Sequence, residues 1–190
     1  MSAPAIASLE LFSTADTWHV DPERSSIGFR VKQRLIESVR GRFLDFDGTI
    51  NSGDAATFVG SIRVASLATD HAKRDEHLRS ADFFNADQFP LMHFASTKVA
   101  LGDDGSLLVT GELTIKETTQ TIALAGTFAG TSIDLDGKER VGFDLRGDLN
   151  RLDFDLSWNR LLETGGLFVG HEVELTLDIV AERSELERAA

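Results

Sequence analysis

Hydrophobic and polar residues alternate along most of the chain with a period of two, the pattern of β-strands that bury one face. Ile27, Phe29 and Val31 begin this pattern, with polar or small residues between them. Comparable stretches follow at positions 39–46, 58–64, 90–101, 107–115, 122–128, 141–145, 152–158 and 173–179. Turn sequences rich in glycine and aspartate, such as 102–105 and 134–138, separate several of them. The pattern predicts about eight strands joined mainly as hairpins.

One of these stretches changes phase. Val39, Gly41 and Phe43 share one face of the expected strand, whereas Leu44 and Phe46 fall on the other. A phase change inside a strand is typical of a β-bulge, which bends a strand around a barrel.

An all-β chain of this kind forms either an antiparallel barrel or a sandwich. A closed barrel of about eight strands has no free edges and has room for one small ligand. Periodicity does not separate the two folds. The barrel is favoured because large aromatic residues share the inward phase with glycines, which leaves space along an axis. The alternative is that the aromatic residues fill a dry core. The inward aromatic residues are Phe29, Phe43, Phe58, Phe94, Phe143, Phe154 and Trp158, and the glycines are Gly41, Gly60 and Gly111.

The stretch 69–96 differs from the rest because it predicts a helix. Asp70 is the expected N-cap. Positions 71–80 carry charge on most faces, so the helix is expected to be solvated. Phe83 and Phe84 follow directly. Two adjacent rings beside a polar helix need an apolar surface to cover, so we interpret this stretch as a lid over one end of the barrel.

Length and charge limit the remaining choices. The 190 residues predict one domain over 17–183, after a flexible extension at 1–16 and before a charged tail at 184–190. A net charge of −12 argues against nucleic acid or an anionic membrane surface as a partner. There is no cysteine, no apolar run of membrane-spanning length and no signal-like N-terminus. We therefore expect a cytoplasmic protein without stable membrane insertion.

Candidate chemistry is sparse. Five histidines are present, but none forms a His-x-x-x-His pair, so no metal is expected. Asp75 and Glu76 with Arg74 and Arg79 are interpreted as surface ion pairs. The alternative is that they fix the helix or meet a polar headgroup. Serines lack a histidine at a catalytic spacing, and nucleotide-binding glycine motifs are absent.

The segment RDEHLRSADFFNADQFPLMHFAS resembles the signature of the YceI family of lipocalin-like, polyisoprenoid-binding proteins. TWHVDPERSSIGFRV, VRGRFLDFDGTI, VTGELTIKETTQTIAL and FVGHEVELTLDIVAE resemble further family segments in the same order, from about Trp18 to Glu182. Arg24, Glu117 and His171 depart from the family pattern at turns and near an expected mouth.

The resemblance implies an eight-stranded antiparallel lipocalin-like barrel with one inserted helix capping it. It also implies a homodimer without catalysis or a cofactor. The pore would bind a long apolar amphiphile of the polyisoprenoid, isoprenoid quinone or fatty acid or amide type, and such a lipid would co-purify. Two alternatives remain: a barrel enzyme, a hydrolase or isomerase acting on an amphiphile, and a filled barrel that serves as an interaction module. The candidate ligand-binding residues are Phe29, Phe43, Phe58, Ile62, Phe83, Phe84, Phe94, Leu113, Leu124, Phe143, Phe154, Trp158, Leu167 and Phe168.

Overall fold

The computed structural model describes residues 14–33, 37–159 and 169–184, and within them the chain forms one antiparallel sheet of strands. The strands are β1 (Thr17–Val20), β2 (Ser26–Gln33), β3 (Glu37–Phe43), β4 (Phe46–Asn51), β5 (Thr57–Arg63), β6 (Leu67–Ala68), β7 (Leu91–Leu101), β8 (Ser106–Ile115), β9 (Thr118–Ile133), β10 (Glu139–Asn150) and β11 (Val169–Arg183). The helical segments are the 3-10 turns η1 (Val64–Ser66) and η2 (Arg151–Phe154) and the α-helix α2 (Ala72–Arg79).

The sheet closes on itself. β11 pairs with β10 on one side, and on its other side it pairs first with β2 and then with β1. β1 and β2 therefore act as one bent strand, and β3 and β4 act as another, pairing with β2 and β1 respectively. With β5 and β7 to β11, these make the eight antiparallel strands of a closed barrel, which confirms the predicted fold class.

The phase change near Leu44 is the point where this second bent strand turns. The structure shows a two-residue break at Leu44 and Asp45 between β3 and β4. Leu44 is 61% exposed, whereas Phe43 and Phe46 are both buried. The break lets rings of opposite sequence phase face the same interior.

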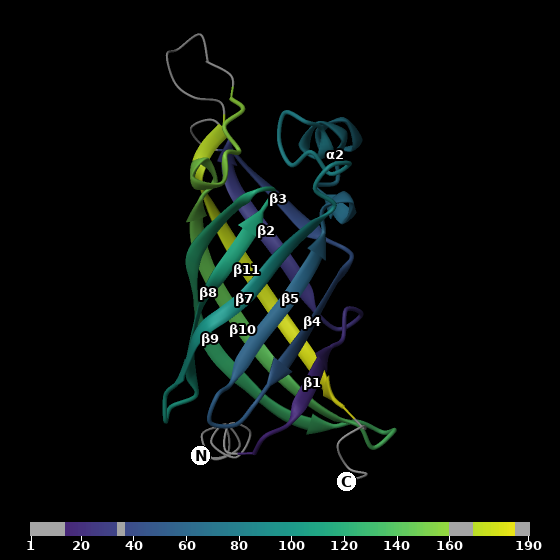
Figure 1. Ribbon diagram of the computed structural model, residues 1–190. Helices are drawn as coiled ribbons and strands as arrows, with labels where there is room; N and C mark the ends of the chain where they lie inside the picture. The colour runs from purple at the N-terminus through teal and green to yellow at the C-terminus, as the bar shows by residue number, and fades with distance from the viewer. Residues whose placement is uncertain (1–13, 34–36, 160–168, 185–190) are drawn as a thin grey trace.

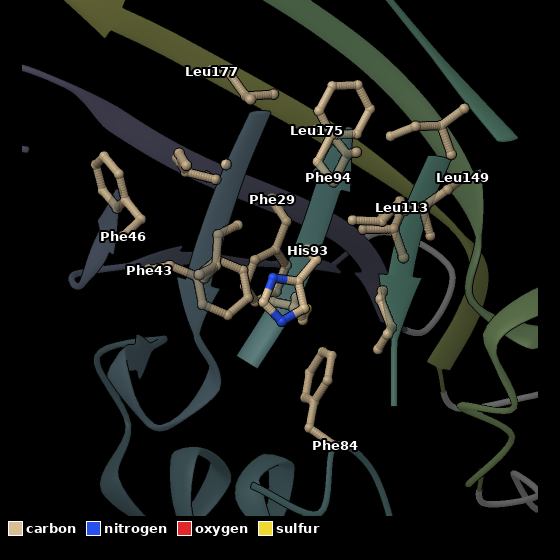
Figure 2. Close-up of a pocket in the computed structure, with 18 of the residues that line it drawn as sticks. Phe29, Phe43, Phe46, Phe84, His93, Phe94, Leu113, Leu149, Leu175 and Leu177 are labelled. Carbon is tan, nitrogen blue, oxygen red and sulfur yellow. The ribbon is translucent and has the colours of Figure 1, made fainter. Parts of the chain in front are cut away.

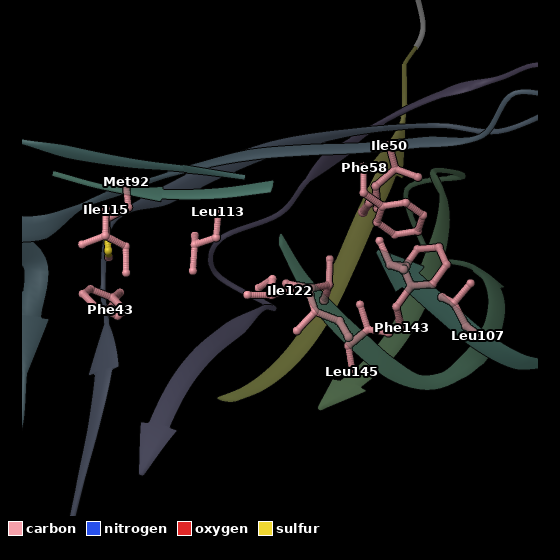
Figure 3. Close-up of a cluster of buried hydrophobic side chains, with 14 of the residues drawn as sticks. Phe43, Ile50, Phe58, Met92, Leu107, Leu113, Ile115, Ile122, Phe143 and Leu145 are labelled. Atoms are coloured by element: carbon pink, nitrogen blue, oxygen red, sulfur yellow. The ribbon is translucent and has the colours of Figure 1, made fainter. Parts of the chain in front are cut away.

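β1 lies at one end of the barrel, and α2 lies at the opposite end (Figure 1). Buried side chains fill the β1 end. Phe143 meets Phe58 edge to face at 5.3 Å between ring centroids, and Phe128 at 5.6 Å. Leu107 and Ile50 belong to the same buried cluster (Figure 3). Offset and edge-to-face ring contacts of this kind stabilise a packed core beyond the area they bury. This end is therefore a dry plug of side chains.

The expected strand at 152–158 is wrong. The structure forms the 3-10 turn η2 there, and β10 continues to Asn150, beyond the expected stretch 141–145. The Asn150 side chain accepts a hydrogen bond from the backbone N–H of Leu152 at 3.0 Å, and Asp155 adopts a left-handed φ of 57°. Short Asn and Asp side chains compete with strand pairing because they form hydrogen bonds to the local backbone. In this segment those bonds favour a turn despite the alternating sequence pattern.

The start of α2 also differs from the prediction. The N-cap is His71, whose Nδ1 accepts from the backbone N–H of Arg74 at 3.3 Å. Asp70, the expected cap, has a positive φ of 58° and instead binds both terminal nitrogens of Arg42 on β3, at 3.0 and 3.1 Å. This two-pronged contact attaches the start of the lid to the barrel wall.

The predicted N-terminal extension is partly tied down. Ser52 donates to the carbonyl of Thr14 at 2.8 Å, and Asp16 forms an ion pair with Arg183 at the end of β11. Residues 1–13 and 185–190 lie outside the described residues, so the rest of that domain prediction is unaffected.

Candidate ligand-binding site

An apolar cavity of about 560 Å³ occupies the barrel between the plug and α2. Figure 2 shows its lining side chains reaching inward from several strands, with Phe84 approaching from the α2 side. Pockets of 300–1,000 Å³ suit a small or medium-sized organic ligand. Aliphatic and aromatic side chains form most of the wall, so the space favours hydrocarbon.

Most of the candidate residues line this cavity. They are Phe29, Phe43, Phe58, Ile62, Phe83, Phe84, Phe94, Leu113, Leu124 and Trp158. Leu167 and Phe168 lie outside the described residues. Phe58 forms part of the cavity boundary on the plug side, because it lines the space and also meets Phe143.

Phe143 and Phe154 do not line the cavity, and this corrects two of the expected positions. Both are 1% exposed. Phe143 has the inward phase of β10, but it lies at the filled end between Phe58 and Phe128. Phe154 belongs to η2 instead of a strand, so its alternating position carries no information about the lumen.

Sequence reasoning found Ile62, Leu113 and Leu124 but missed most of the aliphatic lining, because aromatic rings were given more weight. Most of the missed residues have the inward phase of their strands, so the period of two was sufficient to find them. They include Val31, Val39, Met92, Val109, Ile115, Leu145, Leu149, Val173, Leu175 and Leu177.

The lid meets the barrel through a cluster of three rings. His77 on α2 packs edge to face against Trp158, which follows η2, at 4.6 Å between centroids. Phe83 lies 5.3 Å from each of these two rings. Both Phe83 and the neighbouring Phe84 line the cavity, but Phe83 is buried whereas Phe84 is partly exposed. Phe83 therefore belongs both to the lid cluster and to the cavity wall.

Polar bonds attach the other side of the lid. Asp75 is buried, and its carboxylate accepts hydrogen bonds from both the backbone N–H and the hydroxyl of Thr69. Arg74 donates to the Thr69 hydroxyl at 2.7 Å and to the Thr69 carbonyl at 2.8 Å. Arg79 donates to the carbonyl of Leu67. Arg74, Asp75 and Arg79 therefore fix the helix to the segment before it, which was the alternative to the predicted surface ion pairs.

The mouth beside α2 is polar and largely basic. His71, Lys73, Arg74 and His77 of the lid all line the cavity. Among the described residues, Lys73 makes no hydrogen bond or ion pair. A free ammonium on a flexible stem at the rim can meet a polar group without being buried.

Arg151 lies at the same rim but is buried. Its guanidinium donates to the carbonyls of Gly170 at 2.8 Å and Trp158 at 2.9 Å, and also to that of Leu156. Burial lowers the pKa of Arg151, although an arginine stays charged at neutral pH. Arg151 thus ties together the chain segments on both sides of positions 160–168.

Among the described residues, no group of three histidine, aspartate or glutamate side chains is arranged to hold a metal ion. The cavity instead combines an apolar interior with a polar rim, which fits the two ends of an amphiphile. Within the described part of the chain, no helix is both long and apolar enough to cross a membrane.

Fold and cavity together define a lipocalin-like β-barrel with an apolar lumen. Comparison with known proteins gives the family. The model of the YceI-like domain matches residues 18–181, so the chain belongs to the YceI-like family.

Similar sequences and solved structures support the same family assignment. A UPF0312 protein of Staphylococcus aureus (strain MSSA476) is 33% identical over 159 residues, covering 81% of this chain and 90% of the relative. A YceI protein from Campylobacter jejuni is 30% identical, with a TM-score of 0.69 over 81% of this chain and 90% of its own. Burkholderia cenocepacia BcnA shares the fold at 24% identity, with a TM-score of 0.72 over 85% and 98% of the two chains.

Proposed function

We propose that the protein binds one long apolar amphiphile in the barrel cavity and acts as its carrier or store, without catalysis. The observation that carries the proposal is the unfilled apolar space of about 560 Å³ inside a closed barrel. A barrel serving only as an interaction module has no need of such a space, because side chains would fill it as they do at the plug end.

The proposed ligand class is a polyisoprenoid, an isoprenoid quinone or a fatty acid or amide. Membership of the YceI-like family supports an apolar ligand. A polyisoprenoid-binding domain from Saccharophagus degradans shares the fold, with a TM-score of 0.67 at 14% identity, over 90% of this chain and all of that domain. The hydrocarbon would lie against the strands, and the headgroup would meet Lys73 and the histidines of the lid.

The test is native purification, extraction with organic solvent and mass spectrometry of the extract. We expect a lipid in stoichiometric amount. Replacement of Leu113, which faces the cavity, by tryptophan should fill space and lower the bound lipid at least several-fold. Leu108→Trp is the matched control, since Leu108 lies on the same strand and is 43% exposed on the outer face.

A wild-type protein that yields no lipid and takes up none from added lipid would contradict the proposal. An altered extracted lipid, converted in a time-dependent way by the purified protein, would favour the barrel enzyme instead. The homodimer implied by the family is part of the proposal, and sedimentation equilibrium tests it. The cytoplasmic location stays a prediction.

A further inference from the structure

Two aromatic rings of the cavity wall lie directly over glycines. Phe29 on β2 is in register with Gly41 on the neighbouring strand β3, and both positions face inward. A Cβ atom built on Gly41 would lie 2.5 Å from Cε1 and 2.9 Å from Cε2 of the Phe29 ring. The ring therefore occupies the space that any other residue at position 41 would need.

The same arrangement occurs across the lumen. The ring of Phe94 on β7 covers Gly111 on β8, where a Cβ atom would lie 2.5 Å from Cζ and 2.7 Å from Cε2. Phe29 and Phe94 come from strands that are not neighbours in the sheet, and both line the same cavity (Figure 2). Each ring lies back against its own wall instead of projecting towards the axis.

Backbone conformation does not require glycine at position 41. Gly41 is outside the left-handed region of φ, which this chain uses at Gly53, Gly105, Gly130 and Gly137. Glycine inside a strand weakens it unless something approaches closely. At Gly41 the three nearest atoms all belong to the Phe29 ring, whereas at Gly111 the carbonyl oxygen of Ala95 also lies 2.6 Å from the position of a Cβ atom. Gly41 thus leaves room for the ring of Phe29.

We propose that Gly41 is a specificity-determining residue, because it lets the Phe29 ring lie flat and so sets the width of the cavity. Any side chain at position 41 would push that ring into the lumen. The lost width is the space that methyl branches on a ligand chain require. The lumen of the wild-type protein is therefore wide enough for a methyl-branched chain. A lumen narrowed by a side chain at position 41 would still admit a linear chain.

The test compares two probe lipids in Gly41→Ala and wild-type protein. Geranylgeraniol is a methyl-branched alcohol and octadecan-1-ol is a linear one, and the binding of each is measured by its displacement of the fluorescent probe N-phenyl-1-naphthylamine. We expect Gly41→Ala to weaken geranylgeraniol binding by about tenfold or more, the scale of one misplaced methylene in an apolar pocket. Octadecan-1-ol binding should change much less. The double variant Gly41→Ala with Phe29→Leu should recover geranylgeraniol binding, because the smaller side chain no longer competes for space.

Gly142→Ala is the matched control. Gly142 faces outward on β10, and a Cβ atom there would meet only the Cβ of Ala129 at 3.3 Å, so neither probe should change. Equal losses for both probes, or no loss, would overturn the inference, as would failure of the Phe29→Leu change to restore binding.

The ligand test rests on the proposed function, and a second measurement does not. Xenon occupancy in pressurised crystals reports empty apolar space directly. Occupancy beside Phe29 should fall in Gly41→Ala and return in the double variant, even if neither alcohol binds the wild type. Unchanged xenon occupancy would overturn the role of Gly41 itself, whereas loss of alcohol binding with the expected xenon pattern would point to a wrong ligand class.

Discussion

Two aspartates face each other on the outside of the barrel, at directly opposed positions of β10 and β11. A hydrogen bond to Asp178, reinforced by desolvation and charge repulsion, raises the pKa of Asp144. Burial alone would raise the pKa of Asp178 too, but hydrogen bonds from Asp144, Ser26 and Arg146 outweigh it and lower that pKa. The shared proton therefore belongs to Asp144, because Asp178 has the cationic and hydroxyl partners, with Ser26 at 3.1 Å and Arg146 at 3.2 Å.

We predict that Asp144→Asn stabilises the protein at neutral pH by about 0.2–1 kcal/mol, the range for a cross-strand pair. A raised folded-state pKa means that Asp144 favours folding below its unfolded pKa and that this benefit is lost as the pH rises through the folded pKa. The gain should therefore be full at neutral pH and shrink on acidification. Urea unfolding between pH 4 and 8 measures it.

The partner variant gives the opposite result. Asp178→Asn should lower stability at neutral pH, because a lowered folded-state pKa contributes stability that is present above the unfolded pKa. Equal effects of the two substitutions at every pH would show that the carboxyl groups do not share a proton.

The lid is held by two kinds of contact on its two sides. Polar bonds from Arg74, Asp75 and Arg79 fix it to the segment around β6. Rings fix it to the segment after η2, through His77, Phe83 and Trp158. Loss of the ring contacts alone would leave the polar side as a hinge.

We predict that Phe83→Ala opens the lid while the barrel stays folded. Each aromatic pair adds about 0.5–1.5 kcal/mol beyond area burial, so local opening should become easier than global unfolding. Hydrogen exchange at positions 72–89 should accelerate, and bound lipid should dissociate faster. Phe84→Ala is the comparison, because Phe84 also lines the cavity but is less buried than Phe83. It should alter affinity with a smaller change in exchange.

Global unfolding of Phe83→Ala would instead show that this ring belongs to the core. Faster exchange with unchanged lipid release would place the entry path elsewhere, at the rim formed by Arg151 and Trp158.

The fold was predictable because most long strands turn one face inward, and β8 shows this most clearly, with buried and more exposed residues alternating along its length. The N-cap of α2 and the 3-10 turn η2 were not predictable, because a single side-chain hydrogen bond determines each of them. Asn150 bonds to the backbone of Leu152, and His71 rather than Asp70 bonds to that of Arg74. The alternating pattern shows which side chains point into the barrel, but it does not show how far along the barrel axis each one lies. Phe94 and Phe143 are equivalent in pattern, yet one lines the cavity and the other fills the plug.

This difference in height divides the barrel into a part that provides stability and a part that provides space. Phe128, Phe143 and Leu107 are nearly inaccessible at the filled end. Phe29 and Phe94, at the open end, are only partly buried because one side of each ring faces the cavity. Rings with partners on every side contribute more dispersion energy than rings beside a void.

We predict that alanine at these two levels separates stability from binding. Phe143→Ala should cost about 3–5 kcal/mol of unfolding free energy, as expected for a ring removed from a filled core. It should leave lipid affinity nearly unchanged in the fraction that remains folded. Phe94→Ala should cost less, because the ring has fewer neighbours and its removal enlarges a space that already exists. Its main effect should be on affinity for the bound lipid. Thermal unfolding and competition with N-phenyl-1-naphthylamine measure the two quantities on the same samples. A larger stability loss for Phe94→Ala than for Phe143→Ala would mean that the cavity is closed in solution and that the open end is packed as tightly as the plug.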